Sequence, residues 1–315
     1  MMHEQLNIGV IGLGVMGQRM LARLAQHPRL QATVVWDANP AAVAQTLARY
    51  PQLQAATDAA ALIVTPGLLS LYIATPPAPH MSLSELAFDA GLAVFCEKPL
   101  TVDFDAARRC IQRIEIEGQR AAVNFALAST QGLSLLQSSF GNGSTSPLGA
   151  LTGIELDIAF AAWPRPWQAA AGAWLGERIE GGFTREVLSH FVFVMQRVLG
   201  PLRVQSSAVD YPAGGIASET ALSATLSAAG VPIRIDAKIS GEIADQNRML
   251  WRAADGEIAL NTWFSQINQG PTEAALPAPL DQLDQWAALI ERRPHSLPGY
   301  AESLAVQQTI EALLK

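Results

Sequence analysis

A carboxylate and an imidazole stand four residues apart at Glu186 and His190. On a helix this spacing puts both side chains on one face, one turn apart. The residues around them are mostly apolar, so we expect a shielded pair whose pKa values the surroundings can tune. Such a pair can move a proton as acid and base. The alternative is a core histidine whose hydrogen bonds the neighbouring glutamate satisfies.

A glycine-rich turn lies near the N-terminus, after an apolar run at 8–11. Its residues are Gly12, Leu13, Gly14, Val15, Met16 and Gly17. In a dinucleotide-binding turn the first glycine allows the tight turn, the second lets the backbone approach a pyrophosphate, and the third lets the helix pack closely on the strand. The N-terminus of the following helix adds amides and the positive end of its dipole. All six residues are predicted to bind a dinucleotide.

Asp37 lies 20 residues beyond Gly17, at the end of the second predicted strand. A carboxylate at this place accepts hydrogen bonds from the adenosine ribose hydroxyls and repels a 2′-phosphate. Residues 38–40 contain no arginine or lysine that would bind such a phosphate. NAD is therefore favoured over NADP as the cofactor.

Two further predicted strands end in residues that can reach a cofactor. Thr75 and Pro76 follow one strand, while Glu97 and Lys98 stand at the end of the next. Because the carboxyl ends of parallel strands share the edge at which dinucleotides bind, these four residues are predicted to line the cofactor site. The alternative for Lys98 is a surface lysine placed where the chain turns. His80 could touch the cofactor, but we expect it to start a helix.

Together these motifs resemble the Gfo/Idh/MocA oxidoreductases, the family of glucose-fructose oxidoreductase, inositol dehydrogenase and their relatives. The resemblance implies an N-terminal Rossmann domain and a C-terminal α/β domain with an open sheet. It also implies that Lys98 lies beside nicotinamide and substrate, and that His190 is the catalytic acid/base. The chain departs from the family in having Glu186 where aspartate is usual, and Asn124-Phe125 where an aromatic-Arg element is common.

The predicted function is NAD(P)-dependent hydride transfer between nicotinamide and a secondary alcohol or ketone of a sugar, polyol or related small molecule. In this mechanism His190 moves the hydroxyl proton, Lys98 steadies the oxygen, and Glu186 orients the imidazole or binds a substrate hydroxyl. The chain has neither a Tyr-x-x-x-Lys motif nor a Cys/His cluster suited to zinc, so no metal is expected. The alternative is a non-catalytic NAD(P)-binding sensor or regulator of the same fold.

Tryptophans gather just ahead of the glycines at 181–182. Trp163, Trp167 and Trp174, with Arg165 between the first two, could form a wall on which a sugar stacks. They could equally belong to the core or to a contact between subunits. Substrate binding is assigned to the following five residues: Lys98, Trp163, Arg165, Glu186 and His190.

Hydrophobic periodicity predicts the elements that hold these residues. Strands at 8–11, 33–36, 69–74, 93–96 and 121–123 alternate with helices at 16–26, 40–49, 79–90 and 103–117. This alternation is typical of an α/β, doubly wound parallel sheet. After a loop at 141–147, longer strands are expected at 152–159, 203–210, 221–228, 233–240, 249–253 and 257–261, and helices at 184–199, 281–292 and 301–314. Hairpin signals at 229–230 and 255–256 predict an α+β domain with an open, mostly antiparallel sheet.

The length of 315 residues predicts two domains. We expect a Rossmann domain at 1–123 and a substrate-binding and oligomerisation domain at 124–315. One face of the second sheet is expected to be apolar and exposed in a monomer, which favours a homodimer or homotetramer formed through that sheet.

Composition excludes several classes of partner. A net charge of -7 with no local basic run makes nucleic acid an unlikely ligand. No window is long and apolar enough to span a membrane, and the N-terminus does not look like a signal peptide. Cys96 and Cys110 are too few for a disulfide framework, as is common in a reducing compartment, so a cytoplasmic protein is expected.

Overall fold

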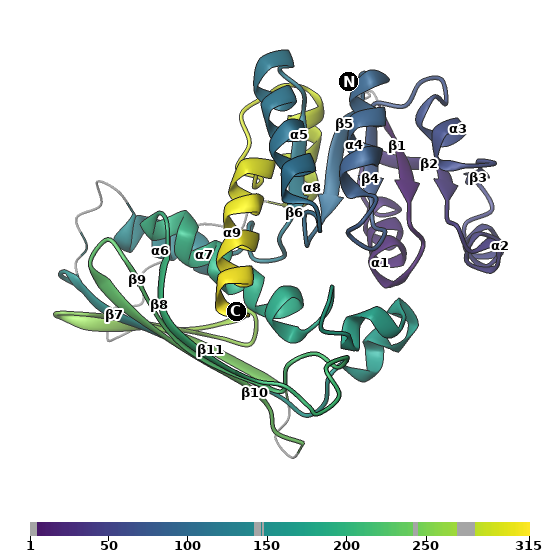
Figure 1. Cartoon of the computed structure of the whole chain (residues 1–315). Helices are drawn as coiled ribbons and strands as arrows, with labels where there is room; N and C mark the ends of the chain where they lie inside the picture. The colour runs from purple at the N-terminus through teal and green to yellow at the C-terminus, as the bar shows by residue number, and fades with distance from the viewer. Residues whose placement is uncertain (1–4, 142–145, 147, 242–244, 270–280) are drawn as a thin grey trace. The chain divides into compact units, whose positions relative to one another are not determined.

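The computed structural model describes residues 5–141, 146, 148–241, 245–269 and 281–315, and Figure 1 shows the elements that they form. The chain divides into two compact units, residues 1–125 with 281–304 and residues 126–280 with 305–315. The segment 281–304 therefore packs with the first unit, although it follows most of the second in the sequence.

The first unit is built on a six-stranded parallel sheet in the order β3-β2-β1-β4-β5-β6. This is the strand order of a doubly wound dinucleotide-binding fold, so the predicted α/β class is confirmed. The strands are β1 (Leu6–Ile11), β2 (Leu30–Trp36), β3 (Gln54–Ala55), β4 (Ser70–Ile73), β5 (Ala93–Glu97) and β6 (Ala121–Asn124).

Helices connect these strands. They are α1 (Val15–Leu24), α2 (Pro40–Arg49), α3 (Ala59–Ile63), α4 (His80–Asp89) and α5 (Phe104–Glu117), and the later segment adds α8 (Gln282–Ile290). The short α3 was not predicted; its N-cap is Asp58, whose side chain accepts a hydrogen bond from the Ala61 amide at 2.7 Å.

Helix α8 packs against the sheet through a buried tryptophan. The ring of Trp286 lies 5.0 Å from that of Phe95 and 5.8 Å from that of Tyr72 between ring centres. Its indole N–H donates to the Ser70 hydroxyl at 2.9 Å, so the polar atom of the ring is satisfied in the core. This contact explains why residues 281–304 belong to the first unit.

The second unit is built on a seven-stranded sheet in the order β13-β12-β11-β7-β10-β9-β8. Strands β7 and β10 are parallel and the other neighbours are antiparallel, which confirms the predicted, mostly antiparallel sheet. The strands are β7 (Leu151–Phe160), β8 (Arg203–Asp210), β9 (Ala221–Ala228), β10 (Val231–Ile239), β11 (Gln246–Ala253), β12 (Gly256–Asn261) and β13 (Gln266–Gln269).

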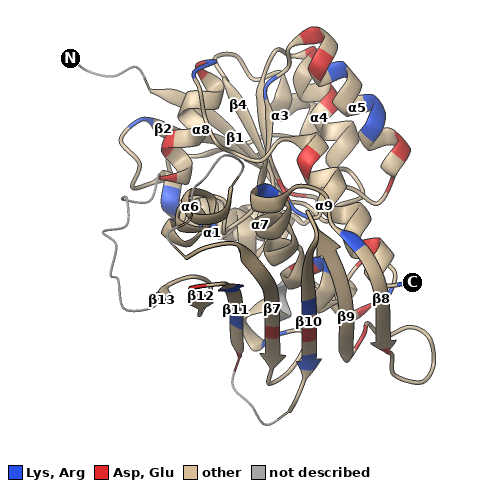
Figure 2. Ribbon diagram, turned by 90° about the vertical axis from the view of Figure 1, so that its left-hand side faces the viewer, with Lys and Arg blue, Asp and Glu red and all other residues tan. Residues whose placement is uncertain are grey.

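Helices α6 and α7 lie on one side of this sheet (Figures 1 and 2). The helices and helical turns that follow β6, apart from α8, are α6 (Gln131–Phe140), the 3₁₀ turns η1 (Pro166–Ala171) and η2 (Ala173–Gly176), the π-helical turn η3 (Thr184–Leu188), α7 (Ser189–Leu199) and α9 (Tyr300–Leu313). Helix α6 was not predicted. The loop expected at 141–147 lies mostly outside the described residues, since 142–145 and 147 are not described.

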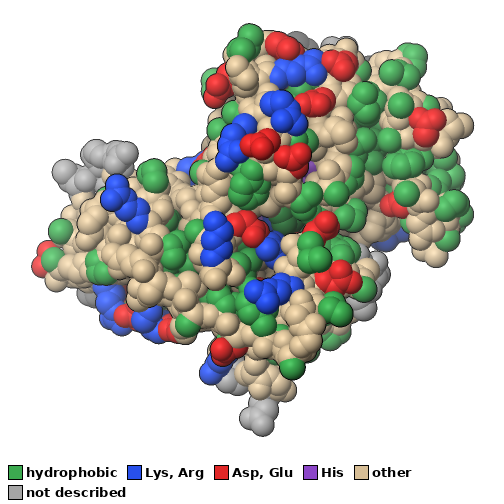
Figure 3. All heavy atoms as spheres, viewed as in Figure 1, with side chains coloured by type: hydrophobic (Ala, Val, Ile, Leu, Met, Phe, Trp, Pro, Cys, Tyr) green, Lys and Arg blue, Asp and Glu red, His purple; other side chains and the backbone are tan. Residues whose placement is uncertain are grey.

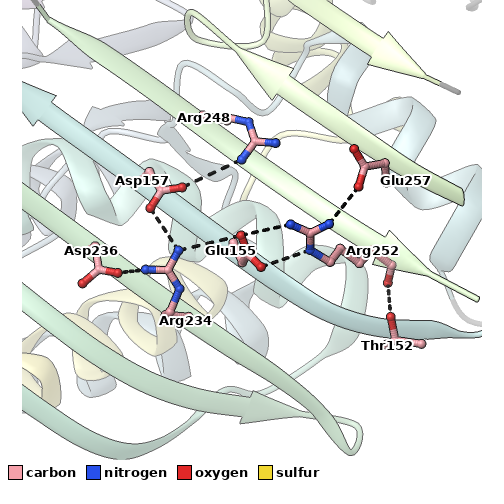
Figure 4. A network of polar contacts seen from close by, with 8 residues as sticks. All are labelled: Thr152, Glu155, Asp157, Arg234, Asp236, Arg248, Arg252 and Glu257. Atoms are coloured by element: carbon pink, nitrogen blue, oxygen red, sulfur yellow. Dashed lines mark hydrogen bonds and ion pairs between the residues drawn. The ribbon is translucent and has the colours of Figure 1, made fainter.

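The other side of the sheet is charged, so the expectation of an apolar free face is wrong. Residues alternate along each strand: Ile233 and Ile235 are buried, whereas Arg234 between them is half exposed. Arg234 pairs with Asp157 at 3.2 Å, and Arg252 on β11 pairs with a second acid of β7 and with Glu257 of β12 (Figure 4). Period-two alternation thus gives a ladder of ion pairs across neighbouring strands.

The described surface mixes both signs of charge. On the face drawn in Figure 3, basic and acidic side chains lie next to one another, with apolar side chains between them. Within the described ranges, none of the helices combines the length and apolar character needed to span a bilayer.

Candidate cofactor and catalytic sites

The glycine turn after β1 has the three properties that the sequence predicted. Gly12 has a φ of +93°, and a Cβ there would lie 2.5 Å from the backbone of Ala74. A Cβ on Gly17 would lie 2.0 Å from the carbonyl oxygen of Gly12, whereas one on Gly14 would meet nothing within 4 Å. Gly12 and Gly17 are therefore required for close packing, and Gly14 leaves open space above the turn.

Asp37 joins the end of β2 to this turn. One carboxylate oxygen accepts from the Leu13 amide at 2.6 Å, and the other accepts from the Asn39 amide at 2.7 Å. Each oxygen has a second lone pair, so the carboxylate can still accept from hydroxyl groups of a ligand. The structure thus assigns Asp37 a role that was not predicted, which is to hold the turn in shape.

The loop after β4 is tied to the loop after β5 by a buried histidine. One ring nitrogen of His80 lies 2.9 Å from the Thr75 carbonyl oxygen, and the other lies 3.2 Å from that of Leu100. Burial lowers the pKa of His80. A neutral imidazole has one N–H, so it donates to one of these carbonyls at a time. His80, the first residue of α4, therefore fixes the loops that carry Thr75 and Lys98.

Glu97, at the end of β5, lies in a buried hydrogen-bond network. Its carboxylate accepts from the Tyr72 hydroxyl and, at 2.7 Å, from the Asn124 amide group. Burial, with a contribution from the Glu97 charge, raises the pKa of Tyr72 well above its usual value, so Tyr72 remains a donor. Gln282 of α8 donates to the Asn124 side-chain oxygen at 2.8 Å. The network holds the strand end from which the half-buried Lys98 follows.

These residues fit the phosphate and ribose parts of a dinucleotide. The amides at the start of the ten-residue helix α1 follow the open position at Gly14, where no described side chain caps the helix. The buried hydroxyl oxygen of Thr75 has no hydrogen-bond partner among the described residues. An unpartnered buried polar atom at the carboxyl edge of such a sheet is accounted for if a ligand supplies the missing partner.

In the second unit, Glu186 and His190 lie on the continuous helical stretch formed by η3 and α7. Both side chains are buried, with 9% and 5% of their surface exposed, so the predicted shielded environment is confirmed. The first turn is π-helical and not α-helical, a distortion that is frequent at functional sites. Glu186 stands in that turn, and its amide donates to the Gly182 carbonyl oxygen at 3.1 Å.

A second buried carboxylate, Glu219, holds the start of this stretch. One of its oxygens accepts from the Thr184 amide at 2.7 Å, while the other has no partner among the described residues. Burial raises the pKa of Glu219. A Cβ on Gly182, whose φ is +99°, would lie 2.3 Å from the Glu219 carboxylate. No local spacing pattern in the sequence links Gly182 to an acid 37 positions later.

Trp163 and Arg165 lie together in an aromatic cluster. The guanidinium carbon of Arg165 is 5.6 Å from the ring centre of Trp163 and 4.6 Å from that of Trp167. The Trp163 indole N–H donates to the Leu175 carbonyl oxygen at 2.9 Å, and its ring meets Phe183 edge-on. Trp163 thus packs beside the start of η3, while Trp167 is 43% exposed and forms the outer part of the cluster.

Known proteins resemble about a third of this chain in sequence. A 1-carboxy-3-chloro-3,4-dihydroxycyclohexa-1,5-diene dehydrogenase of Comamonas testosteroni is 32% identical over 111 residues, 34% of this chain and 28% of that protein. An inositol 2-dehydrogenase of Pseudomonas fluorescens is 32% identical over 117 residues, 36% of this chain and 35% of that protein. The alignments therefore span about a third of each relative.

Residues 6–125 match the Gfo/Idh/MocA family, described as an oxidoreductase family with an NAD-binding Rossmann fold. The match covers all six strands of the sheet in the first unit. The matched range contains the glycine turn, Asp37, Thr75 and Lys98. The resemblance inferred from those residues is confirmed for this part of the chain.

Solved structures resemble this chain in fold over nearly its whole length. An oxidoreductase of Thermotoga maritima matches 99% of this chain and 96% of its own, with a TM-score of 0.84 and 15% identity. The WlbA dehydrogenase of Bordetella pertussis, solved with NADH and UDP-GlcNAcA, matches 99% and 97%, with a TM-score of 0.84 and 19% identity. At these identities the comparison shows the fold alone.

Proposed function

We propose that the chain is an NAD-dependent dehydrogenase or reductase that acts on a secondary alcohol or ketone of a sugar, polyol or related hydroxylated ring. The observation that carries this proposal is the cofactor edge of the first unit, where an open glycine turn, uncapped amides and Asp37 come together. The curated relatives support the reaction class, because both are named as dehydrogenases. When bound, NAD supplies the hydride acceptor.

His190 is proposed to take the hydroxyl proton of the substrate as the alcohol is oxidised, and to return it in the reverse reaction. Its burial excludes water, which strengthens the interactions that control the proton. Glu186, buried in the preceding turn, is proposed to orient the imidazole or to bind a substrate hydroxyl. The glutamate is one methylene longer than the aspartate that the family resemblance implies.

Lys98 is proposed to stabilise the developing alkoxide through its positive charge. The buried Glu97 network and the His80 bridge fix the backbone on both sides of Lys98, which is the support that a charged group needs to act at a defined place. Trp163 and Arg165 are proposed to shape the substrate pocket with the exposed ring of Trp167.

Replacement of His190 by Asn tests the acid/base assignment. Turnover should fall by roughly 10²- to 10⁴-fold, while NADH binding stays unchanged. Turnover is measured by NADH absorbance with a panel of polyols, sugars and ketones that includes myo-inositol. Wild-type turnover in H190N would refute the assignment. If the wild-type protein binds NADH by fluorescence but no compound of the panel changes the NADH absorbance, the result favours a dinucleotide-binding sensor.

We also propose that the protein forms a homodimer or homotetramer through the sheet of the second unit. Since the free face carries ion pairs, such an interface has to match charges and not only bury apolar surface (Figure 4). Light scattering at low and high salt measures the molar mass of the protein in solution. A monomer mass at low salt refutes the proposed oligomer.

A further inference from the structure

The turn between β12 and β13 has an unusual backbone. Thr262, Trp263 and Phe264 have φ angles of +49°, +56° and +64°, and none of them is glycine. Residues with a Cβ rarely adopt this left-handed conformation, and three in succession are disfavoured further. Backbone strain of this kind persists only where surrounding contacts determine it, and it gathers at functional sites.

Neighbouring residues hold this turn in place. The side-chain oxygen of Asn247 accepts from the Trp263 amide at 2.8 Å, and its carbonyl oxygen accepts from the Thr262 amide at 3.2 Å. Phe264 is buried against Gly132 of α6, where a Cβ would lie 2.9 Å from the phenyl ring. Anchors on both sides of Trp263 thus fix the direction in which its side chain leaves the backbone.

The side chain presented in this way contacts the proposed acid/base. The ring centres of Trp263 and His190 are 5.4 Å apart, with the ring planes at 78°. Trp263 also lies against Phe191, with ring centres 5.5 Å apart. The indole therefore lies over two successive residues of α7. It is half-buried, whereas the imidazole is buried.

We propose that Trp263 is a positioning residue, which holds the imidazole of His190 in the orientation needed for proton transfer. This inference rests on the proposed function of His190. An imidazole can rotate about the bond to its ring, and a flat, rigid neighbour at near-right angles limits that rotation. The strained turn at 262–264 is then explained by this role, because its backbone directs the Trp263 indole onto the His190 imidazole.

The test compares W263L, which removes the ring, with W263F, which keeps a smaller one. Phe140→Leu is the matched control, because it also removes an aromatic ring: Phe140 is on α6 and stacks on Trp251, with ring centres 5.7 Å apart. Histidine-labelled protein is followed by NMR, which needs no substrate. The chain has five histidines, and the His190 signal is the one absent from H190N.

In W263L the His190 signal should shift and broaden as the ring gains orientations, while F140L leaves it in place. With the panel compound that the wild type oxidises, W263L should lower kcat by about 10- to 100-fold with the KM for NAD unchanged, and W263F should retain most of kcat. The positioning role is overturned if the His190 signal is the same in W263L and wild type, or if W263L lowers kcat no more than F140L. Wild-type turnover in H190N refutes the acid/base role of His190 instead, and the NMR comparison then still reports whether Trp263 fixes the ring.

Discussion

Removal of the Asp37 carboxylate should weaken NADH binding and change the choice between NADH and NADPH. The carboxylate already accepts hydrogen bonds from Leu13 and Asn39 amides at 2.6 and 2.7 Å. In the bound state it is proposed to accept from the adenosine ribose as well. A hydrogen bond to a charged group contributes about 1.5–3 kcal/mol. Loss of one such ribose contact in D37A therefore raises the Kd for NADH by about 10- to 100-fold.

The Asn variant separates charge from shape. D37N keeps one acceptor oxygen at the same place, so its Kd for NADH should rise by only about 10-fold, equivalent to about 1.4 kcal/mol. Both variants remove the repulsion of a 2′-phosphate, so the ratio of NADPH to NADH affinity should rise in each. Fluorescence titration with the two reduced cofactors measures these constants.

A matched control is Asp58→Ala, which removes the carboxylate that caps α3 through the Ala61 amide. D58A should lose stability of about 0.5–2 kcal/mol and keep the wild-type Kd for NADH. The reasoning is refuted if D37A binds NADH as the wild type does, or if the wild-type protein already prefers NADPH.

Two further outcomes follow from the glycine turn and from Glu219. Gly17→Ala should abolish NADH binding and lower the thermal midpoint of unfolding, because its Cβ would lie 2.0 Å from the Gly12 carbonyl oxygen. A Cβ at Gly14 would meet nothing within 4 Å, so Gly14→Ala should lower the midpoint much less. Equal midpoints for the two variants would contradict this. Since the folded-state pKa of Glu219 is raised above its usual value, the unfolded state releases the proton first, and the free energy of unfolding should fall with rising pH between the two pKa values. Glu219→Gln is neutral throughout and should remove this fall in urea titrations; the same slope in both proteins would count against the assignment.

The first unit could be predicted from the sequence because its signals are local. The apolar run of β1, the glycine turn and the start of α1 are contiguous, and the structure places them in the first half of one βαβ unit that β2 completes. Asp37 was predicted as a ribose ligand, but its bond to the Leu13 amide depends on how β2 lies beside β1. The shape of the turn could therefore be predicted from the sequence, but the contact that holds it could not.

The charged sheet face was misjudged although the sequence contains the necessary pattern. Ile233, Arg234, Ile235 and Asp236 alternate strictly, and period two predicts one apolar and one polar face. The apolar face was expected to be exposed, but it is the face on which helices α6 and α7 lie. Since α6 was not predicted, the cover for the apolar side was underestimated. Gly132 weakens the helical pattern of α6 in the sequence. A glycine is needed there because a Cβ would lie 2.9 Å from the ring of Phe264, which is distant in the sequence.

The second unit shows what local patterns cannot supply at a site. Spacing alone placed Glu186 and His190 in one buried helical stretch, but the groups that hold this stretch come from distant positions. Gly182 carries a positive φ and lies under the Glu219 carboxylate, while Trp263 reaches the imidazole from the turn between β12 and the edge strand β13. Each contact pairs a residue with one more than thirty positions away, so only the tertiary fold brings them together. A histidine on a helix is therefore a weak prediction of catalysis by itself, and the role proposed for Trp263 rests in turn on the role proposed for His190.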